Sequence, residues 1–310
     1  WQINAPKLWK KDFHSFFWLH HLRATDSFSA STFSQTILNR WINEYGQWDE
    51  FVWNIPLIAL RLESWILNYD FIIFDAKEKF LNKFINSLFK QLKHFLIWNN
   101  LNDSSIDKIQ IGLTLYLSGV FTGKKKLSQK GVRLVNNEIE KSYINKNMFN
   151  CSNSSEVLIV LRVLSTLYNL NNQTFKIPID KIDSLIDHFS KVIITLMHHD
   201  EKLSIFNGSF EDNEYLDIIF KNLKIKKTNI KPLSSITDLG FERINNKRLL
   251  IIAKSGKFNS PKNFLGPLSF EASIGKERLV VNCGTFSGED KNWNELSQTN
   301  QAYSTLTINN

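Results

Sequence analysis

The stretch that decides the fold runs over residues 75–98 and reads DAKEKFLNKFINSLFKQLKHFLIW. Its apolar residues recur every three or four positions, as at Phe80, Phe84, Leu88 and Leu92. Because an α-helix turns once in about 3.6 residues, this spacing places them along one side of a helix. The stretch therefore predicts an amphipathic helix whose apolar side packs against other helices.

Helical spacing continues on both sides of this segment. The further segments are bounded by Ser, Asp, Asn or Gly, or by Pro at a first turn. The helices predicted in this way cover residues 31–45, 56–69, 104–121, 127–143, 155–168, 179–198 and 211–223. Since the links are short and no strand pattern interrupts them, we expect helical hairpins packed side by side, as in an α/α toroid or a solenoid. The sequence has no fixed-period repeat, which makes a solenoid of near-identical units the weaker alternative.

After Pro232 the pattern changes to one typical of β-strands. The β-rich runs, separated by Gly, Asn, Ser and Pro, cover residues 248–254, 267–273, 277–283 and 303–308. The segment SIGK, residues 273–276, is predicted to form a hairpin turn. We therefore predict an α+β protein, with an α/α toroid over residues 1–232 and an antiparallel β-sheet or sandwich over residues 233–310. Because four or five strands make a thin sheet, we expect it either to lie on the helical domain or to belong to a larger sandwich that is truncated here.

Composition excludes several classes of protein. Of the 310 residues, 43% are hydrophobic and 13% aromatic, which is too apolar for a disordered chain. The mean hydropathy of −0.23 is too polar for a membrane bundle, and no apolar run approaches the roughly 20 residues that span a bilayer. The two cysteines, Cys151 and Cys283, have no C-x-x-C spacing, so neither a zinc ribbon nor a disulfide scaffold is predicted.

The formal net charge of +8 is concentrated in one segment. Residues 221–262, the basic segment, contain eleven Lys or Arg and two acidic residues, a surplus of nine. Such a segment can neutralise phosphate, sulfate or uronate, or it can simply be solvated. No helix-turn-helix, RNA-recognition or zinc-finger pattern accompanies it, which makes nucleic acid the weaker partner.

The histidines do not have the spacing of a metal site. His20-His21 and His198-His199 are adjacent pairs, and H-x-x-x-H is absent. We therefore predict no metal site and no cofactor. G-x-S-x-G, G-x-x-x-x-G-K-[ST] and G-x-G-x-x-G are also absent, which disfavours hydrolase, nucleotide and dinucleotide functions.

Eight of the nine tryptophans lie in the first 98 residues. Aromatic side chains at helical spacing usually fill a core, but aromatic faces with polar neighbours also stack on sugar rings. Trp53, Arg61 and Trp65 lie near the start of one predicted helix and are candidates for contact with a sugar. Both interpretations stay open from the sequence.

Blocks along the whole chain resemble the heparinase II/III-like family. Towards the C-terminus they are GFER (240–243), PLSFE (267–271), VVNCG (280–284) and AYSTLTI (302–308). Upstream they are WLHH (18–21), the segment 53–65, LSG (117–119) and LSIFNGS (203–209). The blocks follow that family's order and spacing.

The resemblance implies a helical toroid followed by an antiparallel β-sandwich, with a polysaccharide cleft between them. Members of the family are bacterial lyases that act on uronate-containing, often sulfated, polysaccharides. The expected partner is therefore an anionic polysaccharide, and the expected location is the bacterial periplasm or cell envelope, with the cytoplasm as an alternative.

The reaction implied by the resemblance is β-elimination. A polar group neutralises the uronate carboxylate, a base removes the C5 proton, and an acid protonates the departing O4. The family usually supplies an Asn-His pair, a Tyr and a His for these roles. The matching positions here hold Ile106-Asp107, Glu156, Lys262 and Phe264. A lyase with relocated catalytic groups and a catalytically inactive binder of anionic glycans both remain open.

The remaining candidates have suitable chemistry at positions inside the matching blocks. Tyr303, at the position of a later Ala-His motif, is a candidate base or acid, and Asn207 is a candidate partner for the uronate carboxylate. The predicted substrate-binding residues are Lys262, Arg243, Arg61, Trp53, Trp65 and His20.

Overall fold

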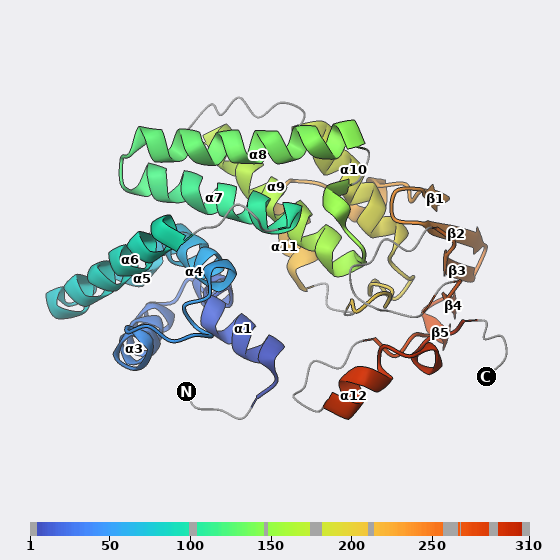
Figure 1. Ribbon diagram of the computed structural model, residues 1–310, viewed down its shortest axis with the longest axis horizontal. Coiled ribbons are helices and arrows are strands. Elements are labelled where there is room, and N and C mark those ends of the chain that lie inside the picture. Colours follow the sequence, from blue (N-terminus) through green and yellow to red (C-terminus); the bar gives the residue numbers. More distant parts are fainter. Residues whose placement is uncertain are drawn as a thin grey trace. The chain divides into compact units, whose positions relative to one another are not determined.

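The computed structural model describes residues 5–98, 104–145, 148–173, 182–209, 214–256, 266, 268–284 and 291–305. The chain divides into two compact units, Trp1–Val135 and Asn136–Asn310. The first unit is helical, and the second contains both helices and a sheet (Figure 1).

The first unit is built around α4. Its helices are α1 (Lys7–Ser15), α2 (Leu19–Ala24), α3 (Phe28–Tyr45), α4 (Ile55–Leu67), α5 (Tyr69–Ile73), α6 (Glu78–Trp98), α7 (Ser105–Phe121) and the first part of α8 (Lys125–Asn145). Helix α4 packs against α1, α6 and α7. The helices predicted from Ser31 to Tyr143 are confirmed to within a few residues, whereas α1, α2 and α5 were not predicted.

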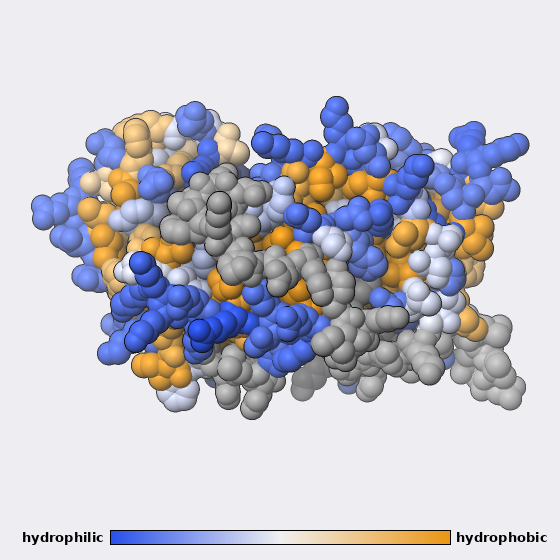
Figure 2. All heavy atoms as spheres, turned by 90° about the horizontal axis from the view of Figure 1, so that it is seen from above, coloured by the Kyte–Doolittle hydropathy of each residue, from blue (hydrophilic) through white to orange (hydrophobic). Residues whose placement is uncertain are grey.

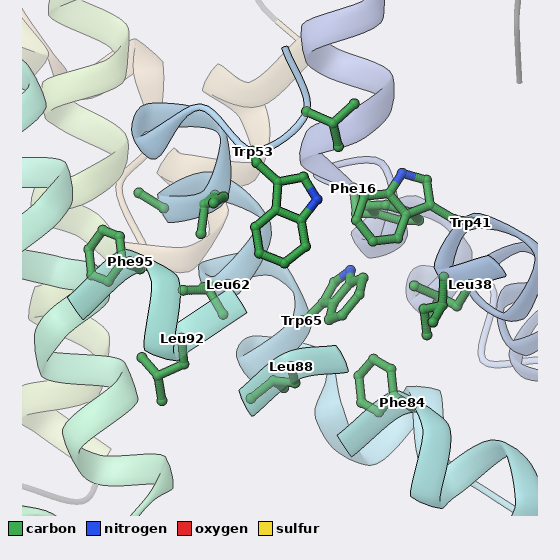
Figure 3. Close-up of a cluster of buried hydrophobic side chains, with 14 of the residues drawn as sticks. Phe16, Leu38, Trp41, Trp53, Leu62, Trp65, Phe84, Leu88, Leu92 and Phe95 are labelled. Atoms are coloured by element: carbon green, nitrogen blue, oxygen red, sulfur yellow. The ribbon is translucent and has the colours of Figure 1, made fainter. Parts of the chain in front are cut away.

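Aromatic rings form the centre of the first unit's core. Trp65 of α4 is fully buried, and its ring meets those of Phe16 and Trp41 edge-on, with both centroid distances at 5.6 Å. Phe84 of α6 lies 5.0 Å away by the same measure. Figure 3 shows these rings beside Leu88, another residue of α6. The apolar side of α6 therefore faces this core, as its spacing predicts.

Glycines allow α7 and α8 to approach closely. A Cβ atom on Gly131 would lie 2.5 Å from both the carbonyl oxygen of Gly112 and the nitrogen of Tyr116. A Cβ atom on Gly119 would lie 2.2 Å from the nitrogen of Ser128. These distances are shorter than any van der Waals contact, so only a residue without a side chain fits at either position.

In the second unit, α9 is the central helix. It covers Ser154–Gln173 and contacts both α10 (Ile182–Thr195) and α11 (Glu214–Asn222). The described parts of the helices predicted over 155–168, 179–198 and 211–223 are confirmed, although α10 ends three residues earlier than predicted. The shorter helices are η1 (Met148–Asn150), η2 (Lys227–Asn229), α12 (Lys291–Leu296) and η3 (Asn300–Ala302).

The sheet of the second unit is an antiparallel meander of five strands in the order β1-β2-β3-β4-β5 (Figure 1). The strands are β1 (Ser235–Ile236), β2 (Phe241–Asn246), β3 (Leu249–Lys254), β4 (Phe270–Ile274) and β5 (Glu277–Val280). Gly275 has a φ of 57° in the turn between β4 and β5, which confirms the predicted hairpin. The predicted α+β class, with helices followed by an antiparallel sheet, is confirmed.

Two sequence predictions differ from the structure or fall outside it. Residues 303–305 are not in a strand, because the short helix η3 immediately precedes them, and residues 306–308 lie outside the described part of the chain. The compact units divide at residue 135, so α9, α10 and α11 belong with the sheet. The domain boundary predicted at residue 232 marks the change from helix to strand and stays a prediction.

In the part of the chain that the structure describes, every helix is too short or too polar to cross a membrane. Figure 2 shows hydrophobic patches separated by hydrophilic residues on the viewed face.

Candidate functional site

Polar side chains gather where three segments of the second unit meet. Lys254 Nζ, at the end of β3, donates a hydrogen bond of 2.6 Å to Asn207 Oδ1. Asn207 Nδ2 donates one of 2.7 Å to the carbonyl oxygen of Ser152, and Asn153 Nδ2 donates one of 3.1 Å to the carbonyl oxygen of Asn207. These four residues are called the Lys254 cluster below. It joins the sheet, the loop after α10 and the start of α9.

The local backbone explains why these side chains point inward. Lys254 shares a face of β3 with Leu250 and Ile252, and all three are buried. Asn207 lies in a tight turn with a φ of 51°, a left-handed conformation that Asn adopts more readily than most residues. Gly208 follows with a φ of 79°. The turn and the strand thus direct the amide and the amine towards each other.

The start of α9 is held by reciprocal caps. Asn153 Oδ1 accepts a hydrogen bond of 2.9 Å from the backbone nitrogen of Glu156. Glu156 Oε2 in turn accepts from the backbone nitrogen of Ser152 at 2.7 Å and from its hydroxyl at 2.8 Å. These bonds satisfy groups that a helix terminus leaves without partners. The Glu156 carboxylate is therefore engaged in capping the start of α9.

Asp107 has a similar role at the start of α7. The Ser104 hydroxyl accepts a hydrogen bond of 3.1 Å from the backbone nitrogen of Asp107 and donates one of 2.7 Å to its Oδ2. Both carboxylates thus lie in the first turn of a helix, where negative charge is favourable.

The surroundings of Lys254 change its acidity. The residue is only 4% exposed, and burial lowers the pKa of its amine from 10.5 to about 8, because a low-dielectric environment disfavours the ammonium form. Near pH 8 the amine therefore exists in both forms. As an ammonium it can neutralise a carboxylate, and as a neutral amine it can accept a proton.

A buried ionic network fixes the loop that carries Asn207. Glu271 of β4 is 0% exposed, and its Oε2 accepts from His198 Nε2 at 3.1 Å and from Arg278 at 3.2 Å. Its Oε1 accepts from the backbone nitrogens of Ile205 at 3.0 Å and Asn282 at 3.2 Å. We call these residues the Glu271 network. The carboxylate links the sheet to residues on both sides of the turn between His198 and Ile205.

Arg278 extends this network to the protein surface. Its Nε donates to Asp200 Oδ2 at 3.0 Å, and a terminal nitrogen donates to Asp200 Oδ1 at 3.2 Å. Bidentate pairing of this kind fixes the orientation of both groups.

Tyr303, a predicted catalytic residue, is 7% exposed, and its ring lies against Gly266. Within the described part of the chain its hydroxyl has no hydrogen-bond partner. Burial, with a smaller contribution from Cys283, raises the pKa of Tyr303 to about 12. The hydroxyl is therefore protonated near neutral pH, which suits a proton donor.

Arg243, predicted to bind substrate, closes the C-terminal end of α10. One of its terminal nitrogens donates hydrogen bonds of 2.7 Å to the carbonyl oxygens of both Thr195 and Met197. Burial lowers its pKa to about 10. A cation at this position satisfies carbonyl groups left open by the helix end. Lys262 and Phe264 lie outside the described residues.

Arg61 and its neighbours belong to the first unit, where they lie in the core. Arg61 is 0% exposed, donates to the carbonyl oxygens of His14 at 3.1 Å and Val52 at 2.9 Å, and lies 4.6 Å from the Trp41 ring centroid. Its Nε donates to Gln91. Burial lowers its pKa to about 9. Arg61 thus has a structural role in the core.

The other aromatic candidates are also accounted for by packing. Trp65 lies at the centre of the core, and Trp53 is buried with its Nε1 donating to the carbonyl oxygen of Tyr45 at 2.9 Å. His20 is partly buried and donates through Nδ1 to the carbonyl oxygen of Phe17, and its ring is tilted by 41° against that of His21. Contact of these residues with a sugar stays a prediction.

The sequence did not single out Lys254, although a signal existed. Residues 249–254 read LLIIAK, and position 254 is in phase with the buried positions 250 and 252. In the sequence analysis Lys254 was only one of the eleven basic residues of the basic segment. The structure separates them: Lys221, Lys224 and Lys247 are exposed, whereas Lys254 is internal.

Residue groups that could hold a metal ion were also sought. Across the described ranges, no group of three or more His, Cys, Asp or Glu side chains is suitably placed.

Comparisons with known proteins bear on the fold of the chain. Residues 229–310 match the family model described as "Heparinase II/III-like, C-terminal". No curated protein matches the sequence significantly. Among solved structures, the chain is similar to the crystal structure of heparinase III, with a TM-score of 0.75 and 13% identity over 99% of this chain and 56% of that one.

A second similar structure is a mutant of a heparan sulfate lyase from Pedobacter heparinus. The TM-score is 0.62 at 15% identity, over 99% of this chain and 55% of that one. The chain thus spans little more than half the length of these structures. At such identities the similarity shows the fold. The chain therefore has the fold of heparinase III, and its residues 229–310 match the heparinase II/III-like C-terminal family model.

Proposed function

We propose that this chain forms part of a polysaccharide lyase that binds an anionic, uronate-containing polysaccharide and cleaves it by β-elimination. The match of residues 229–310 to the heparinase II/III-like C-terminal model is the observation that carries the proposal. The similarity to heparinase III and to a heparan sulfate lyase supports the same class of substrate.

The second unit offers groups for each part of the reaction. β-Elimination requires a neutralised carboxylate, a base at C5 and an acid at O4. Asn207 with Lys254 supplies an amide and a titratable amine, and Tyr303 supplies a protonated hydroxyl. In this proposal Lys262 and the exposed lysines of the basic segment attract the anionic chain.

The experiment is to incubate the 310-residue protein with heparin, heparan sulfate, chondroitin sulfate and alginate, and to follow the absorbance of the unsaturated uronate. Asn207→Ala is expected to lower the rate by about a hundredfold, as is typical when a group that stabilises developing charge is removed. Asn246→Ala, at the exposed end of β2, is the matched control and should leave the rate unchanged. Equal rates for both variants would remove Asn207 from the site.

A catalytically inactive glycan binder is the second candidate. It is favoured by one observation: Asp107 and Glu156, which the resemblance places at or near catalytic positions, form hydrogen bonds at the starts of helices. Retention on immobilised heparin without product from any polysaccharide would support the binder and refute the lyase. Salt-sensitive binding of DNA or RNA that outcompetes heparin would contradict both glycan functions.

A further inference from the structure

We propose that Lys254 is the base, and then the acid, of the β-elimination, with Asn207 as the residue that positions its amine. This inference rests on the proposed lyase function and assigns its proton transfers to a lysine that neither the sequence motifs nor the comparisons identify.

The geometry holds the amine in one place. Lys254 projects from the buried face of β3, and its Nζ lies 2.6 Å from Asn207 Oδ1. Asn207 is itself fixed at its amide by Ser152 and at its carbonyl oxygen by Asn153. A flexible lysine is thereby directed by a rigid acceptor, which is the pre-organisation that a catalytic group needs.

The chemistry of Lys254 differs from that of the other candidates in the second unit. A base must be available in its unprotonated form near the working pH. The pKa of about 8 gives Lys254 such a form, whereas the pKa values of about 10 for Arg243 and about 12 for Tyr303 do not. A desolvated lysine of this kind is a recognised type of general base.

The reaction balances with this one group. The neutral amine takes the C5 proton, and the electrons of the C5–H bond form the C4=C5 double bond. The C4–O4 bond breaks, and O4 leaves with its electron pair. The ammonium then returns the same proton to O4, so that the lysine is regenerated and no further reactant is consumed. A proton taken and returned by one group requires the C5–H bond and O4 to lie on the same face of the sugar.

The test compares Lys254→Arg, Lys254→Met and the control Lys276→Met, which changes an exposed lysine in the turn between β4 and β5. Initial rates of unsaturated product and affinity for heparin are measured from about pH 6 to about pH 10. The wild-type rate should rise about tenfold per pH unit up to about pH 8 and then level. Both Lys254 variants should lose roughly a hundredfold or more in rate while retaining heparin affinity within about threefold, and the control should match the wild type.

Asn207→Asp tests the positioning role. A carboxylate at that position would hold the ammonium more tightly and raise the pKa of Lys254. The midpoint of the rate profile should then move up by about one pH unit or more. A purely structural Asn207 would leave the midpoint where it is.

The outcomes separate this inference from the proposed function. If the wild type is active and the Lys254 variants match it, with the same pH midpoint, Lys254 is not the base and the lyase function stands. If the wild type yields no product from any polysaccharide, both fail. If Lys254→Met does not fold, the midpoint of the wild-type pH–rate profile and its shift in Asn207→Asp decide whether Lys254 is the base. A wild-type pH–rate profile that is flat around pH 8 refutes the inference.

Discussion

The indole Nε1 of Trp41 donates a hydrogen bond of 3.0 Å to Nδ1 of His14, and both side chains are buried in the first unit. Indole nitrogen can only donate, so Nδ1 must be the acceptor and His14 must be neutral. Burial, followed by the nearby charge of Arg61, lowers the pKa of His14 from 6.5 to about 4. A proton on Nδ1 would break the hydrogen bond and place a second cation beside Arg61.

This relationship predicts a loss of stability in mild acid. The folded-state pKa lies below that of the unfolded chain, so between pH 6.5 and pH 4 the unfolded chain binds more protons. The contribution is present above pH 6.5 and is lost as the pH falls towards 4, by about 3 kcal/mol at 1.36 kcal/mol per pKa unit. Urea unfolding of the wild type and His14→Gln should differ in this pH dependence. His21→Gln, at an exposed position, should retain the wild-type dependence, and a parallel profile for His14→Gln would contradict the prediction.

Lys254 predicts a pH dependence of the same sign in base, where stability should rise with pH. Its folded-state pKa of about 8 lies below the ordinary 10.5, so the cost of burying the ammonium is fully present below pH 8 and disappears as the pH rises to 10.5. The stability of Lys254→Met relative to the wild type should therefore fall by about 3 kcal/mol over that range. Denaturant titrations at several pH values measure the difference. For Lys276→Met the difference should stay constant with pH.

Glu271 should be among the costliest residues to remove. In Glu271→Ala the buried His198, Arg278 and the backbone nitrogen of Ile205 lose their shared acceptor. We expect a loss of about 3–5 kcal/mol in the free energy of unfolding. Glu277→Ala, at an exposed position of β5, should cost less than about 0.5 kcal/mol. Similar losses in the two variants would show that the Glu271 network contributes little.

Tyr303→Phe separates a structural from a functional hydroxyl. Since the hydroxyl has no partner within the described residues, its removal should change the unfolding free energy by less than about 1 kcal/mol. Because Lys254 returns the proton to O4 in the mechanism proposed above, the rate of product formation should stay within about threefold of the wild type, and a hundredfold fall would assign the acid role to Tyr303. Thermal unfolding and the absorbance assay distinguish the two effects. A marked fall in melting temperature would instead show that the hydroxyl stabilises the fold.

The sequence predicted the helices with the clearest period and missed the short elements. Helix α6 begins three residues after the predicted start and ends at the predicted Trp98, because its apolar stripe extends over its whole length. The six residues of β2 were not predicted, since the strand ends in exposed polar positions and its pattern lacks a continuous alternation. Register and tertiary pairing, which local patterns do not encode, define such a strand.

The site was predictable only in part for the same reason. Asn207 was selected from the sequence, and the structure places it at the centre of the Lys254 cluster. Its partner lies 47 residues away, and no local spacing connects the two. For Arg61 and Trp65 the sequence left core and sugar-binding roles open, and three-dimensional burial is what distinguishes such roles.

The Glu271 network also constrains how this protein can diverge. One carboxylate receives hydrogen bonds from His198 and Ile205 in the loop after α10, from Arg278 of β5 and from Asn282 just after that strand. A substitution at Glu271 alone leaves buried donors without an acceptor, and a substitution at His198 or Arg278 alone removes part of what compensates the buried charge. Related sequences are therefore expected to exchange Glu271, His198 and Arg278 together or to retain all three. Covariation among these positions would indicate that the contact between the sheet and the loop after α10 is maintained.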